Sequence, residues 1–194
     1  VEELSSGSVC HFCSEVEDWK WFEDRFGQRP TQWAEDQQML GPTSLLINCC
    51  WVTAEEGRIL ARTTTPVAHS PSANMKMASG NAPVRDLRDA GVTVALGTDG
   101  AANNNSFDLI REMKAACLLQ NAVRQTAGAL TAEDALEMAT IGGAAAIGRS
   151  SDLGSLEPGK RADVVLVDLA SPHTWPVTDP VSNLVYAAHG GNVD

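Results

Sequence analysis

Polar side chains that could support hydrolysis follow short apolar runs of this sequence. His11 ends one run, with Glu15 close behind it, and Asp99 follows another run within the segment Gly97-Thr98-Asp99-Gly100. Imidazole and carboxylate groups hold hydrolytic metal ions, and a carboxylate can also move the proton of the attacking water. The residue types predict His11 and Asp99 as ligands of a divalent metal, zinc first and iron as the alternative.

Asn48 and His69 end the two apolar runs that lie between these residues. Taken singly, the histidines and Asp99 each also have an ordinary structural interpretation. A histidine at the end of a strand is often a structural hydrogen-bonding group, and Asp-Gly is common in turns, where Asp99 would bond the amides of Ala101 or Ala102. Their positions at successive run ends favour one shared site.

The five cysteines suggest a second kind of site. Cys10 and Cys13 form a C-x-x-C pair that Cys49 and Cys50 could complete as a redox or structural zinc centre. A redox pair should begin a helix, whereas these residues end an apolar run, so small buried thiols are the favoured interpretation.

The elements that must position these residues alternate between strands and helices. Thr53-Ala-Glu-Glu56 and Thr131-Ala-Glu-Asp134 are capping boxes that predict helix starts. The expected strands are Ser8–Phe12, Ser44–Cys49, Pro66–His69, Val92–Leu96 and Asp163–Val167, and further helices are expected over Glu17–Phe26, Thr31–Met39 and Phe107–Val123. Such a series predicts an α/β fold with a parallel sheet, in which the carboxyl ends of the strands meet on one face.

Charge and hydropathy exclude several classes of partner. The chain of 194 residues has 14 Lys and Arg against 25 Asp and Glu, a net charge of -11. Binding to nucleic acid or an anionic membrane surface depends on clustered basic residues, so neither partner is expected. The modest, odd number of cysteines favours a cytoplasmic or other reducing compartment.

Two long segments carry a resemblance to a known family. They are HSPSANMKMASGNAPV, which begins at His69, and GVTVALGTDGAANNN, which begins at Gly91. Together with GSLEPGKRADVVLVD from Gly154, they resemble the cytosine/adenosine deaminase-like branch of the amidohydrolase superfamily. Within that branch, the S-adenosylhomocysteine/methylthioadenosine deaminases and the triazine and oxopurine hydrolases look most similar.

The resemblance implies a role for each candidate residue. His11 would be a metal ligand on the fifth strand of a barrel, and Asp99 would be both ligand and proton shuttle on the eighth. Glu15 would be the catalytic glutamate, while Asn48, His69 and Asn103 would contact the substrate. The chain departs from the family pattern at two of these positions. Glu15 stands four residues after His11 rather than three, and Asn48 replaces a histidine.

The resemblance also implies the architecture. Residues 1–150 would form the C-terminal half of a TIM-like (β/α)8 metal-dependent hydrolase barrel, from strand five to strand eight. Residues 151–194 would begin a small β-sandwich domain, with a boundary near Arg149–Asp152. The His-x-His pair of the first barrel strand is not in this sequence, so we expect a missing N-terminal half or a companion chain as partner, in an oligomer.

The activity implied is hydrolytic deamination of a purine, nucleoside or related N-heterocycle. Two metal ligands are fewer than the three that a catalytic zinc usually keeps, so the chain is not expected to catalyse alone. The alternative is a degenerate, inactive homologue that serves as a structural or interaction subunit, which the departures at Asn48 and Glu15 favour.

Overall fold

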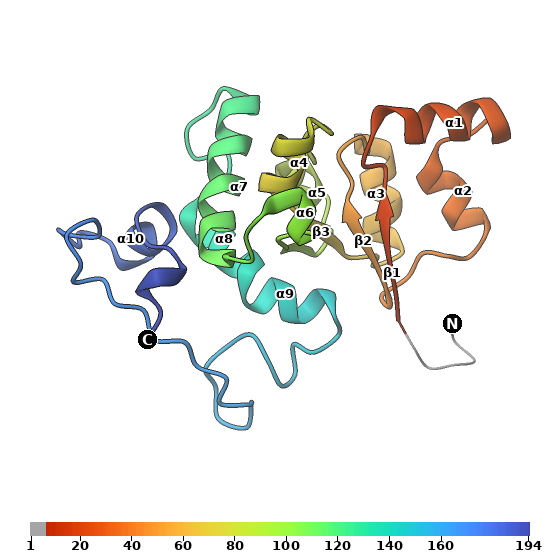
Figure 1. Cartoon of the computed structure of the whole chain (residues 1–194). Coiled ribbons are helices and arrows are strands. Elements are labelled where there is room, and N and C mark those ends of the chain that lie inside the picture. The colour runs from red at the N-terminus through yellow and green to blue at the C-terminus, as the bar shows by residue number, and fades with distance from the viewer. Residues whose placement is uncertain (1–6) are drawn as a thin grey trace.

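The computed structural model describes residues 7–194, which are built around a parallel four-stranded sheet in the order β1-β2-β3-β4 (Figure 1). The strands are β1 (Ser8–Phe12), β2 (Ser44–Asn48), β3 (Val67–His69) and β4 (Val94–Leu96). At least one helix separates each strand from the next, which is the crossover that parallel strands require. The expected α/β fold with a parallel sheet is therefore confirmed.

The helices cover one face of this sheet and extend beyond its last strand. In Figure 1, α1 and α2 lie at the β1 end, whereas α7, α8 and α10 lie toward the β4 end. None of the helices in residues 7–194 is long and apolar enough to cross a membrane. Their bounds are α1 (Val16–Phe26), α2 (Pro30–Asp36), α3 (Ala54–Arg62), α4 (Pro71–Met77), α5 (Val84–Asp89), α6 (Ala101–Asn104), α7 (Leu109–Arg124), α8 (Ala132–Ala139), α9 (Ile141–Ala146), α10 (Pro180–Tyr186) and the 3-10 helix η2 (Gly190–Asn192).

Both predicted capping boxes start helices. The Thr53 hydroxyl accepts a hydrogen bond from the Glu56 amide, and the Glu56 carboxylate accepts one from the Thr53 amide, so α3 begins at the next residue. Thr131 and Asp134 make the same reciprocal pair before α8. Helix α7 starts two residues later than expected because Asp108 caps it, accepting from the amides of Ile110 and Arg111.

The two faces of the sheet differ in what covers them. Because side chains alternate along a strand, Leu46, Val67 and Val94 share one face, and all three are buried beneath the helices. Val9 and His11 lie on the opposite face and are exposed. The buried core around the covered face includes Leu60 of α3, Leu87 of α5, Met113 of α7 and Met138 of α8.

The segment Asp163–Val167, expected as a fifth strand, is not a strand in the structure. Its only pairing among the described residues is an isolated antiparallel bridge between Val167 and Val193. Val164, Val165 and Leu166 are exposed. The segment has the composition of a strand, but a strand also needs a neighbour along its whole length for backbone hydrogen bonds, and residues 7–194 provide none.

Candidate active site at the carboxyl ends of the strands

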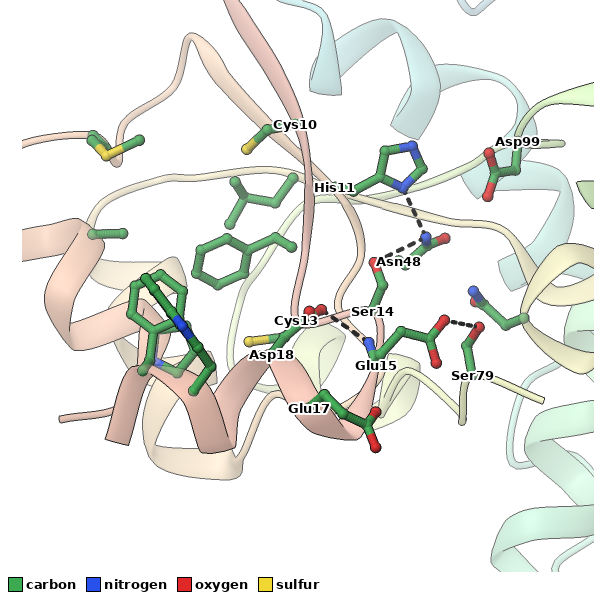
Figure 2. Close-up of a pocket in the computed structure, with 18 of the residues that line it drawn as sticks. Cys10, His11, Cys13, Ser14, Glu15, Glu17, Asp18, Asn48, Ser79 and Asp99 are labelled. Atoms are coloured by element: carbon green, nitrogen blue, oxygen red, sulfur yellow. Dashed lines mark hydrogen bonds between the residues drawn. The ribbon is translucent and has the colours of Figure 1, made fainter. Parts of the chain in front are cut away.

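A cavity of about 840 Å³ lies at the carboxyl end of the sheet and beside β1. Five of the six side chains proposed from the sequence line it, namely His11, Glu15, Asn48, Asp99 and Asn103. Figure 2 shows His11, Asn48 and Asp99 on one side of β1, with Glu15 and Ser79 below them. The parallel topology brings these residues together from positions almost ninety apart in the sequence.

His11 and Asn48 contact each other directly. The Asn48 Nδ2 atom lies 3.1 Å from His11 Nδ1 and donates to the Ser14 hydroxyl at 3.2 Å. Asn48 has a left-handed backbone, with φ of 75°, which asparagine tolerates better than most residues. An amide NH2 group only donates, so in this arrangement His11 Nδ1 accepts, and a neutral ring carries its proton on Nε2. In this arrangement, His11 presents an N–H rather than a lone pair at Nε2.

Glu15 is held at the mouth of the cavity by a residue that the sequence did not single out. The Ser79 hydroxyl donates to Glu15 Oε1 at 2.6 Å, and the Ser79 carbonyl accepts from the Trp51 indole at 2.7 Å. Ser79 is buried, whereas Glu15 is exposed at the start of α1. The only sequence signal for this contact is that Ser79 lies in the long family-like segment from His69.

Asp99 both supports its own turn and faces the cavity. Its Oδ1 atom accepts from the Gly100 amide at 2.6 Å and from Asn103 Nδ2 at 3.4 Å. The turn interpretation named the amides of Ala101 or Ala102, but Gly100 is the backbone donor. Among the described residues, Oδ2 of Asp99 has no hydrogen-bond partner. One oxygen thus supports the turn, and the other is free for a ligand or a proton.

His69 lies apart from this group. It follows Val67 on the helix-covered face of β3, is fully buried and does not line the cavity. Neither ring nitrogen has a hydrogen-bond partner in residues 7–194, and burial lowers the pKa of His69 to about 4. The side chain points into the core because of strand alternation, so the structure does not support the expected direct contact with substrate.

The buried neutral imidazole of His69 predicts a specific pH dependence of stability. Its folded pKa of about 4 lies below the ordinary value of 6.5, so the unfolded chain binds more protons between these values. Stability from this group is therefore present above pH 6.5 and is lost as the pH falls toward 4. From pH 6.5 to 5 the loss is about 1–2 kcal/mol in the free energy of unfolding.

Urea denaturation of the chain and of His69→Met at both pH values measures this loss. His69→Met should have a difference between pH 6.5 and 5 that is smaller by about this amount, whereas the exposed His173→Gln control should behave like the parent chain. Equal pH differences in the parent chain and His69→Met would contradict the assignment.

The cysteines do not assemble a metal centre in the described residues. Cys13, Cys49 and Cys50 are buried and Cys10 is exposed, so the interpretation as buried thiols holds for three of these four. Burial raises the pKa of Cys13 and Cys49, and raises that of Cys50 to about 12. Thiolates are the species that bind metals and attack disulfides, so these groups are inert thiols at neutral pH.

Apart from the cysteines, the described residues also offer few side chains that could bind a metal ion together. Residues 7–194 contain no group of three or more His, Cys, Asp and Glu side chains that could hold an ion. His11 and Asp99 have the right chemistry for two ligands. Metal binding through Nε2 of His11 requires the other tautomer, with the proton on Nδ1, and the Asn48 amide must then present its oxygen to Nδ1. These residues therefore fit part of a metal site and do not complete one.

The comparisons place this geometry in a family. The model of the amidohydrolase family matches residues 2–194. A 5-methylthioadenosine/S-adenosylhomocysteine deaminase of Moorella thermoacetica is 44% identical over 180 residues, which are 93% of this chain and 41% of the relative. A 5'-deoxyadenosine deaminase of Methanothermobacter thermautotrophicus is also 44% identical, over 87% of this chain and 39% of the relative.

Solved structures agree with the sequence relatives. An adenosine deaminase from Xanthomonas campestris with bound zinc superposes with a TM-score of 0.96 at 34% identity, over 99% of this chain and 44% of that one. An atrazine chlorohydrolase from Arthrobacter aurescens, complexed with zinc, has a TM-score of 0.92 at 27% identity, over 43% of its length. The chain thus spans about two fifths of the length of the relatives it matches. On the match of the family model along residues 2–194, the chain belongs to the amidohydrolase family.

Proposed function

We propose that this chain is part of a metal-dependent aminohydrolase that hydrolytically deaminates a purine nucleoside or a related N-heterocycle. The observation that carries the proposal is the grouping of His11, Glu15, Asn48 and Asp99 around one cavity at the strand ends. The names of the relatives support the substrate class, because they act on methylthioadenosine, S-adenosylhomocysteine or 5'-deoxyadenosine.

Each residue has a role that its chemistry allows. His11 and Asp99 would contribute ligands to a divalent metal, zinc before iron, and the metal when bound supplies the activation of water that this hydrolysis needs. Oδ2 of Asp99, which has no hydrogen-bond partner in the described residues, would accept a proton from the attacking water. Glu15 would return a proton to the departing nitrogen, since an amine leaves as neutral ammonia only after protonation. Asn48 and Asn103 would hydrogen-bond the substrate.

We also infer that β1 to β4 correspond to strands five to eight of a (β/α)8 barrel. The outer edge of β1 has no partner strand in residues 7–194, and Val9 on it is 64% exposed. The cavity beside β1 continues into an apolar groove lined by Phe12, Trp21 and Trp33. A further strand and helix would cover this edge and groove, supplied by the rest of the protein or by a companion chain.

For the last part of the chain, we propose residues 151–194 as a partial β-sandwich. The exposed apolar side chains of Val164, Val165 and Leu166 support this assignment, because such a run is normally buried against a second sheet. The free cysteines and the acidic charge are compatible with a cytoplasmic or other reducing compartment, which we propose as the location.

A second candidate function is favoured by Asn48. An amide cannot take or give a proton at neutral pH, so Asn48 cannot act as a base at the position where the family has histidine. Glu15 is displaced by one residue and already bonded to Ser79. The alternative is therefore an inactive homologue with a structural or interaction role.

An ammonia-release assay separates the two functions. We expect no turnover of 5'-methylthioadenosine, S-adenosylhomocysteine or adenosine by residues 1–194 alone, and only weak, sub-stoichiometric zinc binding, because the ligand set is short. An assembly that adds the complementary part of the protein should release ammonia and hold zinc. An assembly that holds zinc without releasing ammonia would favour the structural role. Tight, stoichiometric zinc in residues 1–194 alone would instead contradict the incomplete ligand set and point to the cysteines.

A further inference from the structure

A buried carboxylate lies behind the Asp99 turn, outside the cavity. Glu112, in the first turns of α7, is 1% exposed. Its Oε2 atom accepts from the backbone amide of Ser72 in α4 at 3.1 Å, and its Oε1 atom accepts from Asn104 Nδ2 at 2.9 Å. No Lys or Arg of residues 7–194 forms an ion pair with it. A buried charge without a counterion is destabilising unless hydrogen-bond donors satisfy it, so these two contacts define where Glu112 can sit.

Asn104 links Glu112 to the segment that follows β4. The same Nδ2 atom that donates to Glu112 also donates to the Thr98 carbonyl oxygen at 2.8 Å. Thr98 directly precedes Asp99, and its carbonyl belongs to the peptide plane that joins the two residues. Lys76 of α4 supports the other side of this turn, donating to the Ala102 carbonyl at 2.9 Å.

The conformation of Asp99 explains why this plane needs to be held. Asp99 has φ of 59°, in the left-handed region that residues with a side chain seldom adopt. The angle φ of Asp99 is the rotation between the fixed Thr98 peptide plane and the Asp99 side chain. A contact on the Thr98 carbonyl therefore holds the peptide plane from which the Asp99 side chain projects, while the Gly100 amide and Asn103 hold the carboxylate itself.

We propose that Glu112 is a positioning residue that acts through Asn104 and the Thr98 carbonyl to hold the Asp99 carboxylate toward the cavity. The consequence for catalysis rests on the proposed function. The positioning itself is a property of residues 98–112 and can be measured without any activity.

The amide resonance of Gly100 in the labelled 194-residue chain reports this positioning, because that amide donates to Asp99 Oδ1. In Glu112→Gln, the new NH2 group must face one of two donors, so we expect the Gly100 resonance to move toward its position in Asp99→Ala, which has no side-chain acceptor for the Gly100 amide. Gln120→Met is the matched control. Gln120 is also buried on α7, but it bonds Asn81 and Ala82, so its loss should leave Gly100 unchanged.

A double variant, Glu112→Gln with Asn104→Asp, separates positioning from packing. The amide introduced on α7 can donate to the carboxylate introduced on α6, which restores the link between the two helices. That carboxylate has no proton to donate to the Thr98 carbonyl. We expect thermal stability to recover while the Gly100 resonance stays displaced. Recovery of the Gly100 resonance in the double variant, or an unmoved Gly100 in Glu112→Gln alone, would overturn the proposal.

Asn104→Ala keeps the test valid if Glu112→Gln does not fold. Asn104 is only half-buried, and its removal leaves Glu112 bonded to Ser72. The same displacement of Gly100 is expected, and an unchanged Gly100 resonance in this variant would also overturn the proposal.

Discussion

Asp99→Asn in the complete protein is expected to lower turnover by roughly 10²–10⁴-fold while leaving the fold intact. The amide oxygen of asparagine can still accept from the Gly100 amide, so the turn keeps its hydrogen bond. The amide nitrogen that replaces Oδ2 can neither take a proton nor add a charged ligand to a metal. Zinc content should therefore fall together with turnover.

The measurement is steady-state ammonia release and zinc content of the assembly that contains this chain. Asp168→Asn is a matched control, because Asp168 Oδ1 likewise accepts from a backbone amide, that of Ala170, and Asp168 does not line the cavity. It should leave both quantities at the parent level. Parent-level turnover and zinc in Asp99→Asn would reduce Asp99 to a turn residue.

Arg29→Met is expected to lower the free energy of unfolding by about 3–5 kcal/mol. Glu56 is 3% exposed, and Arg29 donates to its Oε2 atom from both Nε at 3.1 Å and Nη2 at 2.8 Å. Without Arg29, a buried carboxylate keeps its desolvation cost and loses its counterion. The remaining donors to it are the backbone amides of Thr31 and Thr53.

The same arginine connects the core to the site. Arg29 Nη2 also donates to the Trp51 carbonyl at 2.6 Å, and the Trp51 indole holds the Ser79 carbonyl beside Glu15. Urea denaturation at pH 7 measures the loss in Arg29→Met. Adding Glu56→Gln should recover much of it, because the buried charge is removed together with its partner. A loss below about 1 kcal/mol, typical of a surface ion pair, would contradict the buried role.

Glu56, like His69, contributes stability that is lost as the pH falls. The cause differs, because Glu56 is stabilised in its charged form and His69 in its neutral form. Burial opposes the charged form of Glu56, yet the hydrogen bonds from Arg29 and Thr53, with the charge of Arg29, outweigh it and lower the pKa below 4.5. Stability from Glu56 is thus present above its unfolded pKa and is lost as the pH falls through the folded value. The stability contribution of His69 is lost at a higher pH than that of Glu56, from pH 6.5 downward.

The sequence determined the local elements and their order, because the signals for these act over a few residues. The bounds of β1 agree with those expected, and the capping boxes at Thr53 and Thr131 start α3 and α8 where the reciprocal hydrogen bonds predict. The alternation of strand and helix was sufficient to predict the parallel sheet. The sheet in turn brings His11, Asn48 and Asp99 to one edge.

Only the tertiary structure decided how the side chains at that edge are used. The left-handed backbone at Asn48 and Asp99, the burial of His69 and the absence of a fifth strand at Asp163–Val167 in the described chain depend on neighbours far away in the sequence. Ser79 meets Glu15 across 64 positions, and Glu112 meets Ser72 across 40. No periodicity or short motif encodes such contacts. They form because the packing of α4 against α6 and α7 leaves each buried polar atom only a few partners within reach.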